Sequence, residues 1–503
     1  MGSSFAGADS SYHYIKMTTK QYLLVDHPQT LFPLNTTHVL VSECFDALAD
    51  YVYQKVLNQT DINHFLPQSR CNASKNGLHL RRTTKLDPVA KVFIYDLVYR
   101  NRHTFRPDFG QTRRIFGYRF REGFPVPLTE SYSQFRQAIL EANAVYRYAA
   151  CFDISSYFNS VYHHDLVQWF NRDGRSLDDA NNLGQFLRET NSGRSLDCLP
   201  QGLHPCKLIG AEFLKFIDNS NRVRSELFLR FMDDFYLFSD DEDTVSSDFL
   251  TIQQILGEKG LSINAEKTNI GAINQVDVRR EVNEIRAGLL LIRRQIILAS
   301  AMETEPNEVE VFLNPEQVDY LLDLLREPNI DEADADLVLT LLRDHGTDVL
   351  ERMETLLERF PSLSRKVFNY CPYVADRTEL AHLILRFLTN GRHVTEDQLF
   401  WAAKITEDFL SDTEPCANIL SRLYEHPNAT EISQAKLLEI PEHRFGMPEL
   451  REEQLRTGRS DWSAWAAAVG CRNEQPLQRN HKLGYFAHCS SMNALIAECV
   501  HNL

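Results

Sequence analysis

The chain has 503 residues, of which 43% are hydrophobic and 24% charged, and its formal net charge is −16 at pH 7. This length predicts two or more domains, and the composition is typical of a globular protein. No apolar run reaches the roughly 20 residues that cross a bilayer, and the ten scattered cysteines form no CxxC pair. These features argue against a membrane protein, a zinc site and a disulfide framework, and we expect a reducing cytoplasm.

The charge is unevenly distributed along the chain. Residues 291–503 carry 21 Lys and Arg against 35 Asp and Glu, whereas residues 1–290 are nearly neutral. Within the neutral part, residues 70–121 hold 13 basic residues against three acids. Because local charge governs phosphate binding, this segment could contact nucleic acid in spite of the acidic total. A solvated basic face is the alternative.

Up to about residue 285 the pattern is α+β. Aromatic and branched residues predict strands in 145–154, 227–238 and 268–276. Between the last two, residues 248–260 have helical spacing and end at Gly260.

From about residue 290 the sequence predicts helices only. The first is expected after Asn314, a capping residue, with Pro315 at the first helical position. Further amphipathic stretches follow, most of them ending in Gly or Pro. Stacked helical pairs are one interpretation and an irregular bundle is the other, because no fixed-period repeat is visible.

Three aspartates stand out in the α+β part. Asp153 ends one predicted strand, and Asp233 and Asp234 interrupt the apolar run "LFLRFMDDFYLF", where they fit the tip of a hairpin. An Asp-Asp turn is common by itself. If a sheet brings these strand ends together, however, the three carboxylates repel one another unless hard divalent cations bind them. Two Mg²⁺ ions about 4 Å apart, which Mn²⁺ could replace, would activate an attacking hydroxyl and stabilise a leaving pyrophosphate oxygen.

Other polar residues suit the same chemistry. Gln201 and Gly202, in "LPQGLHP", form a turn that a ligand can approach closely, and the Gln201 amide could hydrogen-bond a base or sugar. Lys267 follows an apolar stretch and could donate a proton to a leaving phosphate. The guanidinium groups of Arg106 and Arg113 suit triphosphate oxygens.

Asp153 together with "LPQG" (199–202), "FMDD" (231–234) and "INAEKT" (263–268) resembles, in order and spacing, motifs A to D of reverse transcriptases, the RNA-directed DNA polymerases. Phe231 replaces the Tyr that the family usually has before its paired aspartates. The resemblance implies an α+β right-hand polymerase core, with fingers and palm in 1–285. An all-α helical-repeat or helical-bundle domain would occupy 286–503 and replace the thumb.

The resemblance also implies roles for single residues. Asp153 and Asp233 would be the main ligands of two Mg²⁺ ions, with Asp234 beside them, and Lys267 would be the motif D lysine. The incoming dNTP would be held by Arg106, Arg113, Gln201 and Gly202, while Phe158 would exclude a ribose 2′-OH. Cys206 stands where many relatives have Ser, and no primer-grip motif is recognisable after residue 270.

The stretch "DISSYFNSVYHHDL" (153–166) and the acidic helical tail resemble the bacterial abortive-infection and "unknown group" reverse transcriptases. This implies an antiphage enzyme in the bacterial cytoplasm that makes DNA from dNTPs. It would copy a cognate non-coding RNA or extend a protein tyrosine without a template, and assemble as a homo-oligomer such as a trimer or hexamer, with no membrane partner. Tyr12 and Tyr14 are two of many candidate primers. The alternatives are a retron or mobile-element reverse transcriptase and an inactive nucleic-acid-binding scaffold.

Overall fold

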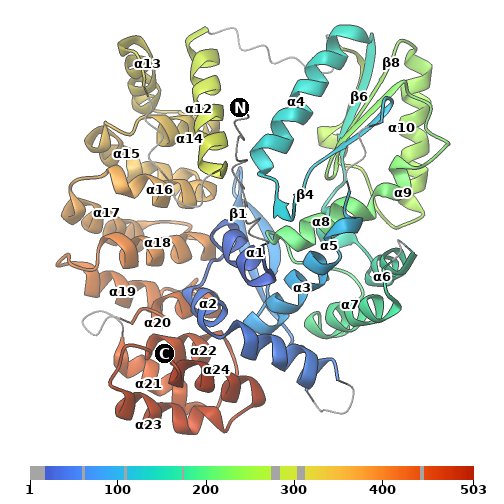
Figure 1. The fold of residues 1–503 in the computed structure, drawn as a ribbon. Helices are drawn as coiled ribbons and strands as arrows, with labels where there is room; N and C mark the ends of the chain where they lie inside the picture. Colours follow the sequence, from blue (N-terminus) through green and yellow to red (C-terminus); the bar gives the residue numbers. More distant parts are fainter. Residues whose placement is uncertain are drawn as a thin grey trace, which may run out of the picture.

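The computed structural model describes residues 17–58, 63–106, 110–172, 175–273, 284–302, 312–441 and 447–503. Tyr12 and Tyr14 therefore lie outside the described residues, as does the end of the strand predicted in 268–276. Helices stack along one side of the molecule and a mixed sheet with its covering helices forms the other side (Figure 1). Within the described ranges no helix combines the length and apolar character that a membrane crossing requires.

The central sheet has the strand order β3-β7-β8-β6-β9. Strand β3 runs parallel to β7, and all other neighbours are antiparallel. The predicted hairpin in 227–238 is confirmed as β7 and β8, and the predicted strand in 145–154 as β6. The bounds are β3 (Arg113–Phe116), β6 (Tyr148–Asp153), β7 (Leu227–Phe231), β8 (Asp234–Ser239) and β9 (Asn269–Ala272).

The two faces of this sheet belong to different apolar clusters. One face packs on α10 (Glu242–Gly257), with Phe152 stacked on Phe235 at 5.1 Å and Phe249 against Phe152 at 5.2 Å. The other face packs on α4 (Leu128–Val145), whose Phe135 lies 5.5 Å from the Phe231 ring. Nearly continuous apolar runs in β6 and β7 thus place buried residues on both faces of the sheet.

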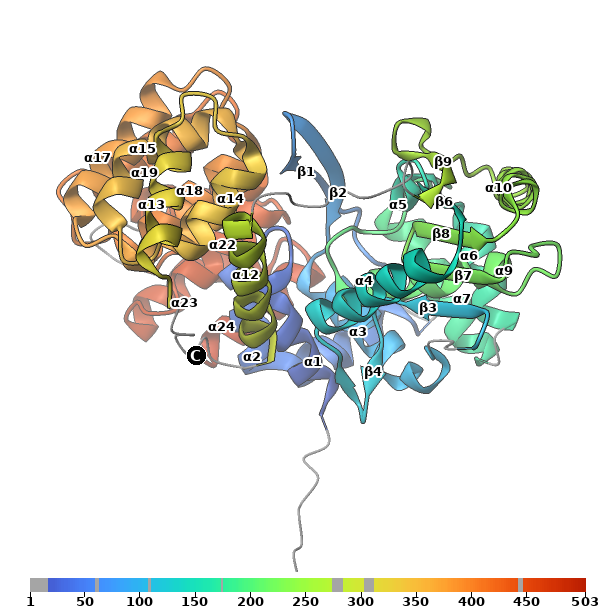
Figure 2. The same cartoon turned by 90° about the horizontal axis from the view of Figure 1, so that it is seen from above.

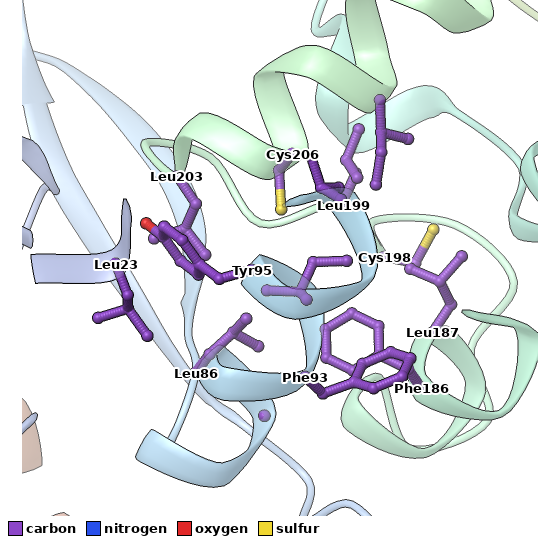
Figure 3. Packing of buried hydrophobic residues seen from close by; sticks show 14 of the residues in the cluster. Leu23, Leu86, Phe93, Tyr95, Phe186, Leu187, Cys198, Leu199, Leu203 and Cys206 are labelled. Carbon is purple, nitrogen blue, oxygen red and sulfur yellow. The ribbon is translucent and has the colours of Figure 1, made fainter. Parts of the chain in front are cut away.

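A largely helical region adjoins the sheet and carries a separate hairpin, β1 (Ser69–Lys75) paired with β2 (His79–Lys85). Figure 3 shows part of its core, in which Phe93 and Phe186 approach to 5.2 Å and Leu199 and Cys206 belong to the same cluster. A short β4–β5 hairpin (Phe120–Arg121, Phe124–Pro125) lies nearby. The helices are α1 (Thr19–Asp26), α2 (Asn35–Asp50), α3 (Pro88–Arg100), α5 (Tyr157–Ser160), α6 (His163–Arg172), α7 (Leu177–Thr190), α8 (His204–Phe213) and α9 (Lys215–Asp218).

The prediction of a helical tail is confirmed for its described residues, from α12 (Glu284–Met302) onward. Asn314 caps α13 through a capping box, with Pro315 first in the helix, as predicted. From α13 onward most helices pack against the next but one, as in stacked helical pairs. The bounds are α13 (Pro315–Arg326), α14 (Glu332–Leu341), α15 (Gly346–Arg359), α16 (Ser364–Tyr370), α17 (Arg377–Asn390), α18 (Glu396–Phe409), α19 (Cys416–Glu425), α20 (Glu431–Leu438), α21 (Pro448–Arg456), α22 (Trp462–Gly470), α23 (Pro476–Ala487) and α24 (Ser491–His501).

The last helices pack back onto the beginning of the chain. Both α22 and α24 contact α2, and Trp462 and Ile496 belong to the same buried cluster as Leu40. Helices α13 to α19 contribute to a second cluster. The division between 1–285 and 286–503 stays a prediction. The first of these buried clusters contains residues from both sides of that boundary.

Candidate active site

Asp153 and Asp234 are brought together by strand pairing. Asp153 is the last residue of β6 and Asp234 the first of β8, and the two are directly paired in the antiparallel register. Directly paired residues place their side chains on the same face, with Cβ atoms about 5 Å apart. Asp233 lies beside them in the two-residue turn that joins β7 to β8.

The backbone of this turn is strained, and a buried arginine holds it in place. Met232, its first residue, has a positive φ of 56°, which is uncommon for a residue other than Gly. Arg230 is fully buried, and its guanidinium donates to the Met232 carbonyl at 2.8 Å and to the Asp218 carboxylate at 2.7 Å. This buried ion pair holds the turn in one geometry. The signal for this role in the sequence is an arginine within an otherwise apolar strand, and the role was not predicted.

Lys267 also reaches the site. Its Nζ lies 2.5 Å from Asp153 Oδ2, although its side chain remains 56% exposed. The segment is aligned by a backbone bond from the Asn264 N–H to the Asp153 carbonyl at 2.9 Å. The hydrogen bond from Lys267 to Asp153 raises the pKa of the Lys267 ammonium. Sequence reasoning placed this lysine near the aspartates, and the structure gives it Asp153 as its partner.

The paired aspartates are electrostatically unfavourable in this structure. Burial, followed by repulsion from Asp233 and Asp153, raises the pKa of Asp234 to about 6. Burial also raises the pKa of Asp233, and Asp153 adds to that effect. Meanwhile Asp153 Oδ1 is buried without a hydrogen-bond partner. A cation at this position would relieve both the repulsion and the unpaired oxygen.

The three aspartates have the ligand atoms that a divalent metal ion prefers, but their side chains do not form a complete coordination site. Carboxylate oxygens are the ligands that Mg²⁺ prefers. Among the described residues, however, no group of three His, Cys, Asp or Glu side chains is close enough together to hold a metal ion. The assignment of Asp153, Asp233 and Asp234 as metal ligands stays a prediction.

The Gln201 turn lies against the β1–β2 hairpin. The Gln201 N–H donates to Thr83 Oγ1 at 3.0 Å, and its side-chain amide donates to Asn159 Oδ1 at 2.8 Å. Gly202 has φ +89°, and a Cβ there would lie 2.7 Å from the Leu31 side chain, so the turn requires glycine. The Gln201 side chain is thus bound to Asn159, which follows Asp153 by six residues in the sequence.

Phe158 is half-buried on α5. A Cβ on Gly210 would lie 3.4 Å from its ring, so the ring packs on α8. The neighbouring Tyr157 is buried and donates from its hydroxyl to the Gly210 carbonyl at 2.7 Å. Phe158 is therefore anchored near Asp153, and its role as a gate against ribose stays a prediction.

The two arginines expected to hold a triphosphate contact backbone carbonyls in this structure. Arg113 is paired with Phe228, on the face of the sheet opposite to Asp153 and Asp234, and donates to the Val223 carbonyl at 2.6 Å. Arg106 is exposed and donates to the His103 carbonyl at 2.7 Å. These contacts give no support to their predicted role with the triphosphate, and that role stays a prediction.

A comparison with protein families matches the region that contains the three aspartates. Residues 111–321 match the family model described as "Reverse transcriptase (RNA-dependent DNA polymerase)". No curated protein matches the chain. Among solved structures, apo telomerase from Candida tropicalis matches with 10% identity over 78% of this chain and 70% of that chain, at a TM-score of 0.28, which is too low to carry an argument. The family match includes all three aspartates, the Gln201 turn and Lys267, and so the chain contains a reverse transcriptase domain at residues 111–321.

Proposed function

We propose that this protein is a magnesium-dependent DNA polymerase that adds deoxynucleotides to a growing strand by phosphoryl transfer. The observation that carries the proposal is the direct pairing of Asp153 with Asp234 next to the Asp233 turn, inside the reverse transcriptase domain. Three carboxylates converging at one end of a sheet are costly, and metal-dependent phosphoryl transfer is a chemistry that makes use of them.

The described residues have separable tasks in this reaction. Asp153, Asp233 and Asp234 would hold two Mg²⁺ ions, which supply charge neutralisation at the attacking and leaving oxygens. Arg230 keeps the Asp233 turn in place through its contact with the Met232 carbonyl. Lys267 holds a proton beside Asp153. Because the ion pair raises its pKa, Lys267 is a poor proton donor while it remains on Asp153.

The biological role that we propose is antiphage defence in the bacterial cytoplasm. Two sequence features support it, the 153–166 stretch and the acidic helical tail. The enzyme would make cDNA either on a cognate non-coding RNA or without a template from a protein tyrosine, as a homo-oligomer. Phe158 would select dNTPs over ribonucleotides.

A second candidate is an inactive polymerase fold that serves as a nucleic-acid-binding scaffold. The observation in its favour is that Lys267 neutralises Asp153 while no cation cage is assembled among the described residues. The two candidates differ in what they expect of Asp233, because only the enzyme requires it as a ligand.

The decisive experiment supplies the purified protein with Mg²⁺ and each dNTP in turn, after sequencing of any co-purified nucleic acid. We expect DNA synthesis that Asp233→Asn abolishes and that Asp243→Asn, an exposed acid at the start of α10, leaves unchanged. Product that migrates with the protein on a denaturing gel would indicate protein priming, and dependence on bound RNA would indicate a template. No synthesis under any condition, or phage protection that survives Asp233→Asn, would favour the scaffold.

A further inference from the structure

Acidic residues from the helical tail line the outer edge of strand β1. Glu396 and Asp397 lie in the first turn of α18, directly after the capping residue Thr395. Figure 2 shows the β1–β2 hairpin between the helical stack and the central sheet. The edge of a two-stranded hairpin presents unpaired backbone groups, which must find partners if they are buried.

The carboxylates accept hydrogen bonds from this edge. The Asn72 N–H donates to Glu396 Oε2 at 2.9 Å, and the Ser74 N–H donates to Asp397 Oδ2 at 3.3 Å. Asn72 and Ser74 are two residues apart, so their N–H groups point to the same edge of the strand. The Ser74 hydroxyl adds a 3.0 Å contact to Thr395 Oγ1. Helix α18 therefore supplies acceptors for two N–H groups at this edge of β1, as the carbonyls of another strand would.

Other helices of the tail extend the contact in both directions. The Ser69 hydroxyl donates to Glu431 Oε2 of α20 at 2.7 Å, and the Gly77 N–H donates to Glu332 Oε2 of α14 at 3.4 Å. Both acids lie in the first turn of their helices. Part of the negative charge of the helical tail is thus used to hold the hairpin along its whole length.

The other strand of the hairpin reaches the candidate active site. Thr83 of β2 is paired with Cys71 of β1, and its hydroxyl both accepts from the Gln201 N–H at 3.0 Å and donates to the Gln201 carbonyl at 3.2 Å. Gln201 in turn donates to Asn159, on the short helix that follows Asp153. An unbroken series of contacts therefore runs from α18 through the hairpin to the Gln201 turn.

A second link joins the hairpin to the same helix. Asp197 forms ion pairs with Arg70 of β1 and with Arg82 of β2, the latter at 3.3 Å. Asp197 also accepts a hydrogen bond from the Asn159 side chain. The hairpin is consequently held on its inner side by Asp197 and Gln201 and on its outer side by the helical tail.

We propose that Glu396 and Asp397 are positioning residues for the polymerase reaction, which hold β1 so that β2 keeps the Gln201 turn beside Asp153. The proposal rests on the proposed function, and it assigns the acidic helical tail a task within the reaction. Rigid supports of this kind matter because a small displacement of a substrate-binding group lowers the rate strongly.

The first test is hydrogen exchange on the full-length protein. In the double variant Glu396→Ala/Asp397→Ala we expect the amides of Asn72 and Ser74 to exchange roughly tenfold faster or more, since each loses a bond to a charged acceptor. The backbone amide of Gln201 should also exchange faster. Glu379→Ala is the matched control, because Glu379 is a first-turn acid of α17 whose partner is Arg386 on its own helix. An unchanged Gln201 amide in the double variant would overturn the proposal.

The second test separates support from catalysis. Thr83→Val removes the hydroxyl that joins β2 to Gln201. It should speed exchange at the Gln201 backbone amide and leave the amides of Asn72 and Ser74 unchanged, which tests the link from β2 to Gln201 even if the double variant does not fold. Both variants should raise the KM for dNTP about tenfold, with a smaller change in kcat. A KM that stays unchanged in both variants would overturn the positioning role.

Failure of the proposed function gives a different result. If the unmodified protein incorporates no nucleotide, the polymerase assignment falls, while hydrogen exchange at Gln201 still shows whether the helical tail supports the turn. If the protein is active and Glu379→Ala raises KM as much as the double variant, the effect comes from the charge of the tail in general, and the positioning role is overturned.

Discussion

Carboxylates concentrate in two regions of this molecule, and their partners differ. At the end of the central sheet, Asp153, Asp233 and Asp234 repel one another, with Lys267 as the nearby cation. At the edge of β1, Glu396 and Asp397 each accept a backbone N–H. Burial raises the pKa of Asp397 to about 7, close to the value of about 6 for Asp234. A raised pKa therefore does not distinguish a functional acid from a structural one here, whereas the available donors do.

The largest difference in activity should appear when one carboxylate in each region is replaced by an amide. Asp153→Asn should lower nucleotide incorporation by about 10³-fold or more, because metal ligation contributes several kcal/mol to the transition state. Asp397→Asn should change it by less than about threefold, since an amide oxygen can still accept from Ser74. Steady-state incorporation of each dNTP measures both. Equal losses in the two variants would remove the distinction between the regions.

A carboxylate at a third position, Glu439, sharpens the structural side of the comparison. Glu439 of the helical tail accepts from the Asn35 and Thr36 N–H groups, at 2.9 and 2.7 Å, at the start of α2, and from Lys436 at 2.6 Å. Glu439→Ala leaves the Asn35 and Thr36 N–H groups without this acceptor, while Lys436 keeps Glu407 as its partner. We expect a loss of about 2–4 kcal/mol in the free energy of unfolding, measured by denaturant titration.

Its control is the exposed Glu425→Ala at the end of α19, which should stay within about 0.5 kcal/mol of the unmodified protein. A loss below about 1 kcal/mol for Glu439→Ala would mean that the helical tail and α2 are not held together by this carboxylate.

Asp234→Asn tests the opposite expectation, that a functional carboxylate destabilises the metal-free protein. Its pKa in the folded protein, about 6, is above the ordinary value of 3.8. Folding therefore favours the protonated form, and the ionised form costs stability above pH 6. The variant should be more stable than the unmodified protein by about 1–3 kcal/mol at pH 8, and this gain should vanish near pH 4. Thermal unfolding in EDTA across this pH range measures it, and a loss of stability at pH 8 would contradict it.

The sequence was sufficient for the elements that depend on local pattern. Runs of aromatic and branched residues predicted β6, β7 and β8, and Asn314 with Pro315 predicted the start of α13. The proximity of Asp153 to Asp234 followed from strand ends in a sheet. The contacts of Glu396 and Glu439 could not be predicted, because their partners lie more than 300 residues away in the chain and a first-turn acid looks the same whether water or a distant strand donates to it.

The smallest effect concerns Arg113, which the sequence assigned to the incoming triphosphate. The structure places it on the face of the sheet opposite to Asp153 and Asp234, about 10 Å along β3 from the position that pairs with Phe231. Its guanidinium stacks on Phe228 and donates to the Val223 carbonyl, which is a structural set of partners. Arg113→Gln should therefore change the KM for dNTP by less than about threefold and cost about 1 kcal/mol of stability. A guanidinium that held the triphosphate would form charge-assisted bonds, and its loss would raise KM tenfold or more. Such a rise would show that Arg113 leaves the Val223 carbonyl when nucleotide binds. The role of Arg113, like that of the three aspartates, would then be set by the ligand that it binds and not by its contacts in the free protein.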